Sequence, residues 1–215
     1  MFRRRLLNTA MSLGLGLGLA ALPLAAAHAW EARLEGIKNH WERVTTEQPQ
    51  GERSDGLRSL ADQAERLVAE HPDEAMPLVW QGIVEASLAR ERSGLGALSS
   101  ARSARDALEK AVELDPEGAN GSAYVTLGAL YDRVPGGLVG FGNSDTAERM
   151  FQRALEIRPD GIDVNFYYAA FLEEEGHTEE AREHARRAVE GQARPARATS
   201  DEALRDEARE LFERL

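Results

Sequence analysis

The sequence contains no cysteine at any of its 215 positions. Disulfides, thiolate metal ligands, a cysteine nucleophile and a lipid anchor on an N-terminal cysteine are therefore excluded. Aromatic residues make up only 6 % of the chain, whereas 42 % of the residues are hydrophobic. Few aromatics together with abundant Ala, Leu, Glu and Arg favour helices over sheets, so we expect an all-α protein with enough apolar residues to build a core.

Basic residues are fewer than acidic residues in this chain. The chain has 26 lysines and arginines and 37 aspartates and glutamates, which gives a formal net charge of −11. An acidic surface of this kind repels nucleic-acid phosphates and anionic lipid headgroups. We therefore expect neither nucleic acid nor a membrane surface among the partners.

The first 29 residues have the organisation of a secretory signal peptide. Three arginines at positions 3–5 precede an apolar run over 13–24, and the segment ends in Ala27-His28-Ala29. Cleavage after Ala29 would leave Trp30 first and a net charge of −14, because the segment holds three arginines and no acid. We predict export to a bacterial periplasm, with no membrane insertion after cleavage. The alternative is an uncleaved anchor, since the run could cross a bilayer if tilted.

Beyond residue 30, apolar residues recur at spacings of three and four, which predicts successive amphipathic helices. Prolines at 72, 116 and 159 lie 44 and 43 residues apart. We predict a helical repeat domain over 30–192, with extra residues at 93–100 and 134–145 between the two helices of a unit. Residues 193–199 then form a linker, and residues 200–215 form a helix that caps the open end of the stack.

The order of residues within one unit indicates the type of repeat. It fits the tetratricopeptide (TPR) pattern, whose ordinary period is about 34 residues. The matching positions are Tyr124, Leu127, Gly128 and Tyr131, then, after a glycine-rich insert, Ala147, Phe151, Ala154 and Pro159. We predict a TPR-like α-solenoid of three to four helical hairpins with a C-terminal capping helix. Small residues such as Gly128 and Ala154 are expected where helices cross closely.

Three short runs carry a resemblance to a known family. They cover 131–137 (YDRVPGG), 140–143 (GFGN) and 158–166 (RPDGIDVNF). From about Asp73 to Leu215 the chain resembles bacterial periplasmic TPR proteins that are similar to the T component associated with TRAP-type transporters. The resemblance implies the TPR fold, a periplasmic location and a protein partner such as a periplasmic solute-binding protein. That component is a lipoprotein, and this chain has no cysteine to acylate.

The first helix of each unit is expected to line the inner wall of such a stack. The predicted partner-binding groove is apolar through its middle and acidic toward its C-terminal end. Its residues are Met76, Val79, Ile83, Val125, Ala129, Asp132, Phe166, Ala170 and Glu173. This surface suits an extended peptide, a small hydrophobic ligand or a partner helix. The alternative is that residues such as Ile83, Val125 and Phe166 are ordinary core.

The insert over 134–143 holds four glycines and the apolar residues Leu138, Val139 and Phe141. A glycine-rich loop before a helix can bind phosphate through its backbone amides. Here no Lys-Ser/Thr follows and no strand precedes, so we do not expect a nucleotide loop. The glycines instead permit a tight excursion, in which the three apolar residues either pack against the helices or contact a ligand or partner.

The sequence shows no recognisable catalytic or metal-binding motif. His177 and His184 lie seven residues apart with glutamates nearby, but the His-Glu-x-x-His pattern is missing, and no histidine stands beside a serine in a known arrangement. We predict a non-enzymatic binding or scaffold protein without metal or cofactor, which recognises a protein or peptide partner in its groove. The alternative is a transporter-associated subunit that binds a small hydrophobic solute. Homo-oligomerisation is left open.

Overall fold

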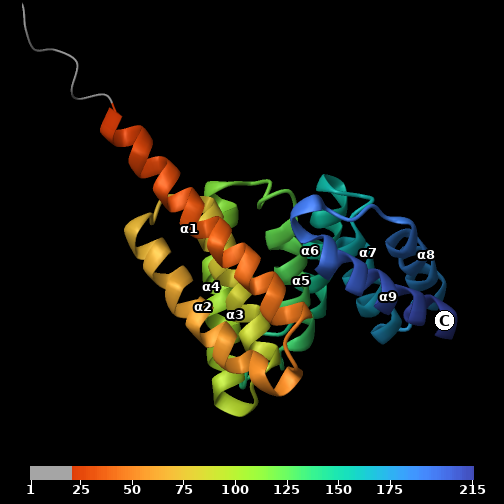
Figure 1. Ribbon diagram of the computed structural model, residues 1–215. Coiled ribbons are helices and arrows are strands. Elements are labelled where there is room, and N and C mark those ends of the chain that lie inside the picture. The colour runs from red at the N-terminus through yellow and green to blue at the C-terminus, as the bar shows by residue number, and fades with distance from the viewer. Residues whose placement is uncertain (1–20) are drawn as a thin grey trace, which may run out of the picture.

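The computed structural model describes residues 21–215, with side chains from Ala29 onward. Within this range the chain forms nine α-helices, one short 3-10 helix and no strand (Figure 1). The elements are α1 (Ala21–Thr46), α2 (Gln50–Glu70), α3 (Ala75–Arg90), α4 (Gly94–Leu114), α5 (Ser122–Arg133), α6 (Ser144–Ile157), α7 (Ile162–Glu174), α8 (Thr178–Glu190), η1 (Pro195–Arg197) and α9 (Ala198–Arg214). The predicted all-α architecture is confirmed.

The first eight helices form four consecutive hairpins. Contacts are densest within the pairs α3/α4, α7/α8 and α5/α6, and each pair also contacts the next. Figure 1 shows the pairs following one another across the molecule, from α1 and α2 to α7 and α8. After α8 the chain turns back through η1, and α9 packs against α8, α7 and α1. Solenoid and capping helix are therefore both present, as predicted.

Glycines set the closest helix crossings, in the same way in two successive hairpins. A Cβ atom placed on Gly82 of α3 would lie 2.3 Å from Cγ of Leu108 in α4. The corresponding atom on Gly128 of α5 would lie 2.7 Å from Cε1 of Phe151 in α6. Both partners are fully buried, so a larger residue on the first helix would collide with a side chain that cannot leave the core.

The extra residues of the repeats differ between the two units. Residues 94–100, expected as an insertion between helices, instead form the first two turns of α4, so this expectation is wrong. Gly94 has a positive φ of 59°, which lets the chain turn directly into the helix after Ser93. The second insertion is a loop between Val134 and Asn143, and its two ends are held together where the amide of Gly142 donates a hydrogen bond to the Pro135 carbonyl at 3.1 Å.

The N-terminal prediction remains a prediction. Most of the proposed signal peptide, residues 1–20, lies outside the described residues. Helix α1 runs from Ala21 through the proposed cleavage site between Ala29 and Trp30 without a break. None of the helices within 21–215 combines the length and the apolar character needed to cross a membrane.

Candidate functional site

The concave side of the helical stack encloses a large hollow. Its volume is about 780 Å³, and its walls come from α1, α3, the start of α4, α5, the insert, α7, η1 and α9. Most of the wall is apolar, with residues such as Ile83, Ala86, Val125 and Leu204. Two exposed apolar side chains, Leu95 at 87 % and Val139 at 65 % exposure, stand at its edge. A volume of this size lies within the range of about 300–1,000 Å³ found for ligand sites.

Three of the nine residues predicted for the groove line this hollow. Ile83 lies on α3, and Val125 and Ala129 lie one turn apart on α5. They come together because the first helices of successive hairpins are adjacent, with α3 in contact with α5 and α5 in contact with α7. These three residues therefore lie together on one apolar surface of the hollow.

The other α3 and α5 residues of the prediction lie elsewhere. Val79 is completely buried in the core, and Met76 packs against the same core cluster. Asp132 is half-buried beside Arg133, at 3.9 Å, and does not line the hollow. Burial and the nearby Glu174 raise its pKa above the ordinary value.

The α7 residues of the prediction are covered by the C-terminal helix. Phe166 and Ala170 pack in a cluster with Ala208 and Leu211 of α9. The carboxylate of Glu173 accepts two hydrogen bonds from Arg214, at 3.0 and 2.8 Å. Helix α9 thus covers Phe166 and Ala170, whereas Glu173 is paired with Arg214 and stays partly exposed.

The three apolar residues of the insert have different surroundings. Phe141 packs edge-on against the Tyr131 ring, with 5.5 Å between centroids, and the guanidinium of Arg105 lies 4.6 Å from its ring centre. Val139 lines the hollow, and its carbonyl accepts a hydrogen bond from Arg102 at 3.1 Å. Leu138 is fully exposed. Packing therefore accounts for Phe141, whereas Leu138 and Val139 are free to contact a partner.

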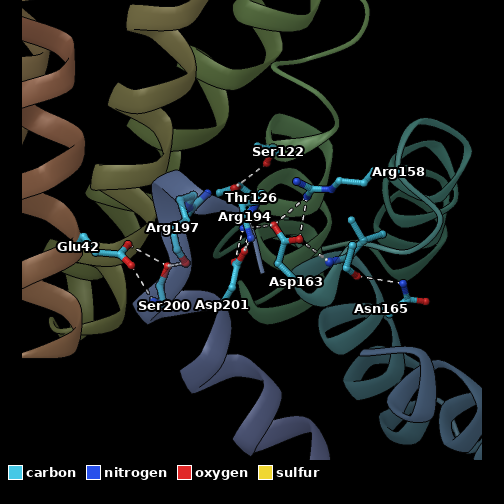
Figure 2. Close-up of polar contacts among 12 residues, drawn as sticks. Glu42, Ser122, Thr126, Arg158, Asp163, Asn165, Arg194, Arg197, Ser200 and Asp201 are labelled. Carbon is cyan, nitrogen blue, oxygen red and sulfur yellow. Dashed lines mark hydrogen bonds and ion pairs between the residues drawn. The ribbon is translucent and has the colours of Figure 1, made fainter. Parts of the chain in front are cut away.

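A buried ionic network that the sequence did not reveal is drawn in Figure 2, and its central residue, Asp163, lines the hollow. In this network, Asp163 of α7 accepts two hydrogen bonds from Nη2 of Arg158, at 2.7 and 2.9 Å, and lies 3.1 Å from Nη2 of Arg194. Burial raises the pKa of Asp163, but Arg194 and Arg158 outweigh it, so the net shift is downward. Arg194 also binds Asp201 of α9, with bonds of 2.6 and 2.9 Å.

Next to this network, hydrogen bonds join helix α1 to the start of helix α9. Glu42 of α1 accepts hydrogen bonds from the backbone amide of Ser200 at 2.7 Å and from its hydroxyl at 2.9 Å. Both donors lie in the first turn of α9, where backbone amides have no partner within the helix. Glu42 therefore satisfies the start of α9 across 158 positions of sequence and holds it against α1 (Figure 2).

The histidines considered as metal ligands have other surroundings. Nδ1 of His184 lies 2.8 Å from Oδ1 of Asn165, its ring contacts Tyr168, and burial lowers its pKa. His177 lies at the start of α8 beside Glu180, at 3.4 Å. Among the side chains that the structure describes, no group of three His, Asp or Glu residues has an arrangement suited to a metal ion.

Comparison with known proteins gives the fold. No protein-family model matches the chain, and no curated protein matches it significantly. Among solved structures it is similar to TTC0263, a thermophilic TPR protein of Thermus thermophilus, with 17 % identity, a TM-score of 0.57, and coverage of 89 % of this chain and 95 % of that one. Two structures of MamA also match, with TM-scores of 0.47 and 0.49, identities of 17 % and 16 %, and coverage of 82 % and 85 % of this chain and 95 % and 90 % of theirs. The chain thus has a TPR-like helical solenoid fold.

Proposed function

We propose that the protein is a non-enzymatic binding module of the bacterial periplasm, which holds an apolar peptide segment of a partner protein in the hollow. The observation that carries the proposal is the hollow itself, about 780 Å³ of mainly apolar surface on the concave side of a TPR-like stack. Exposed apolar side chains at its edge, Leu95 and Val139, extend that surface toward solvent. Burial of apolar peptide side chains there is favourable by roughly 25 cal/mol per Å².

The periplasmic location rests on the signal-peptide pattern of residues 1–29 and on the resemblance to periplasmic TPR proteins. In that compartment a solute-binding protein is one partner of the right class, as the resemblance suggests. The non-enzymatic part of the proposal rests on the carboxylates in and near the hollow, which already have hydrogen-bonding partners within the fold. Asp163, Asp201 and Glu42 are each engaged by arginine or serine side chains within the fold.

Selection of binders from a random peptide display library tests this function. We expect the selected peptides to be enriched in apolar residues and to bind the purified protein reversibly. Ala203 lines the hollow and is exposed, so an Ala203→Trp substitution should fill space in the site without disturbing the core, and should weaken peptide binding about tenfold or more. The matched control is Ala69→Trp, an exposed position on α2 outside the hollow.

Two results would contradict the proposal. One is a selection that yields no peptide; the other is equal affinity of the selected peptides for wild type and Ala203→Trp. Native mass spectrometry of the protein purified from its own host gives a second test. A small hydrophobic adduct that is lost in Ala203→Trp would favour solute binding over peptide binding.

A further inference from the structure

The charge of the hollow is opposite to the charge of the protein. Among the described residues that line it are four arginines, Arg90, Arg92, Arg133 and Arg197, and two carboxylates, Asp163 and Glu207. Arg133 is paired at 3.9 Å with Asp132, which lies outside the lining, so the other three arginines supply the excess of positive charge. Asp163 is moreover neutralised by Arg158 and Arg194. The chain as a whole has a formal net charge of −11. An excess of cations inside the concave surface of an acidic protein points to an anionic group on the molecule that binds there.

Arg197 is the cation best placed to receive that group. Its guanidinium lies over the Trp41 ring at 4.6 Å and near the Trp80 ring at 5.3 Å, and Trp41 and Arg197 both line the hollow. The indole N–H of Trp41 is held by Ser87 Oγ at 2.9 Å, which fixes the ring beneath the arginine. The side chain is therefore positioned by stacking and not by an ion pair.

Among the side chains from residue 29 onward, no carboxylate forms a direct ion pair with Arg197, although Asp163, Asp201 and Glu42 lie near enough to stabilise its charge. Its Nε atom is buried without a hydrogen-bond acceptor. The three nearest carboxylates are occupied elsewhere: Asp163 by Arg158 and Arg194, Asp201 by Arg194, and Glu42 by Ser200. Burial, followed by the neighbouring Arg194, lowers the pKa of Arg197. A buried guanidinium with an unsatisfied N–H group is costly, and an incoming anion that accepts a hydrogen bond from it would offset that cost.

We infer that the hollow recognises an apolar peptide segment that carries a carboxylate, and that this carboxylate pairs with Arg197 while the apolar side chains cover Ile83, Val125 and Leu204. This inference rests on the proposed function, since it names the chemical feature of the peptide that the same site selects. A single negative charge fits best, because the carboxylate of Glu207 also lines the hollow and disfavours a multiply charged group. A planar guanidinium is also suited to two parallel bonds with a carboxylate.

The experiment uses three small probes with the same eight-carbon chain, octanoate, octan-1-ol and octylammonium, titrated into the full protein. Binding is followed by calorimetry and by tryptophan fluorescence, to which Trp41 and Trp80 contribute. We expect octanoate to bind about tenfold more tightly than octan-1-ol, and octylammonium to bind most weakly. In Arg197→Met, which keeps an unbranched side chain against Trp41, octanoate and octan-1-ol should differ by less than about threefold.

Two further variants separate charge from packing. Arg197→Lys should keep most of the preference for octanoate, because it keeps the positive charge. Arg182→Met is the matched control, since Arg182 stacks on Phe212 at 4.5 Å outside the hollow and should leave the preference unchanged. Octanoate that does not bind the wild type, that binds no better than octan-1-ol, or that keeps its advantage in Arg197→Met would overturn the inference.

Binding of the peptides selected by display distinguishes this inference from the function on which it rests. In peptides selected by display, replacement of the acidic residue by Gln should weaken binding about tenfold to wild type and leave binding to Arg197→Met nearly unchanged. Peptides that bind regardless of charge would leave the proposed function in place and remove the role of Arg197. A preference for octanoate without any peptide binder would keep the anion site and reject the peptide as its source.

Discussion

Substitution of Asp163 by Asn removes one charge from the buried network and leaves the shape of the side chain almost unchanged. Asp163 is only 5 % exposed and interacts with Arg158, Arg194 and the amide of Val164, the last at 3.0 Å. The asparagine oxygen can still accept one of these bonds. What it cannot do is balance the charge of Arg158, which is itself largely buried and has no other ion-pair partner among the described side chains.

The expected loss follows from which partner is left unpaired. Arg194 keeps its hydrogen bonds to Asp201, so the substitution leaves only Arg158, and not Arg194, without an ion-pair partner. Breaking a buried pair by removal of one partner costs about 3–5 kcal/mol, and the remaining contacts of Arg194 place this case at the low end, near 3 kcal/mol. The exposed pair between Asp206 and Arg209 supplies the control, because Asp206→Asn should cost less than about 0.5 kcal/mol.

Urea unfolding followed by circular dichroism measures both free energies of unfolding. The pH dependence gives an independent check. The pKa of Asp163 in the folded protein lies below its ordinary value of 3.8, so its stabilising contribution is complete above that value and is lost as the pH falls through the folded-state pKa. The difference between wild type and Asp163→Asn should therefore shrink as the pH is lowered from about 5 to about 3. A loss below about 1 kcal/mol at neutral pH would refute the reasoning, since it would mean that desolvation cancels the ion pairs.

Two further substitutions test packing. Gly128→Ala should lower the free energy of unfolding by about 1–3 kcal/mol, because its Cβ would lie 2.7 Å from Phe151. The control Gly36→Ala on α1 has nothing within 4 Å of its Cβ and should raise the free energy of unfolding by about 0.5–1 kcal/mol. Equal effects of the two substitutions would show that the α5/α6 crossing is not tight. Phe141→Ala should lower the melting temperature, because the loss of contact with Tyr131 and Arg105 costs about 1–2 kcal/mol, and it should leave peptide binding unchanged. An unchanged melting temperature together with lost peptide binding would instead show that Phe141 contacts the partner.

The helical stack could be predicted from sequence because its determinants are local and repeated. Ala147, Phe151 and Ala154 recur at intervals set by the helix period, and all three are completely buried in α6. Gly128 could be identified as a close crossing for the same reason. The start of α4 was missed because a Ser-Gly-Leu-Gly run favours a loop when read alone, although Gly94 only allows the turn that precedes the helix.

The position of α9 could not be predicted, because an amphipathic stripe shows that a helix buries one face and does not show against what. Leu211 and Ala208 are buried as their spacing predicts, but they cover Phe166 on α7, which the repeat pattern had assigned to a partner. The contact that fixes this placement joins Glu42 to Ser200, two residues that no local pattern connects. Helix α9 therefore does more than close the end of the stack: it removes the α7 surface from the groove and brings Arg197 to the wall of the remaining hollow. The charge of that hollow consequently depends on a segment that reads, in the sequence, as a linker.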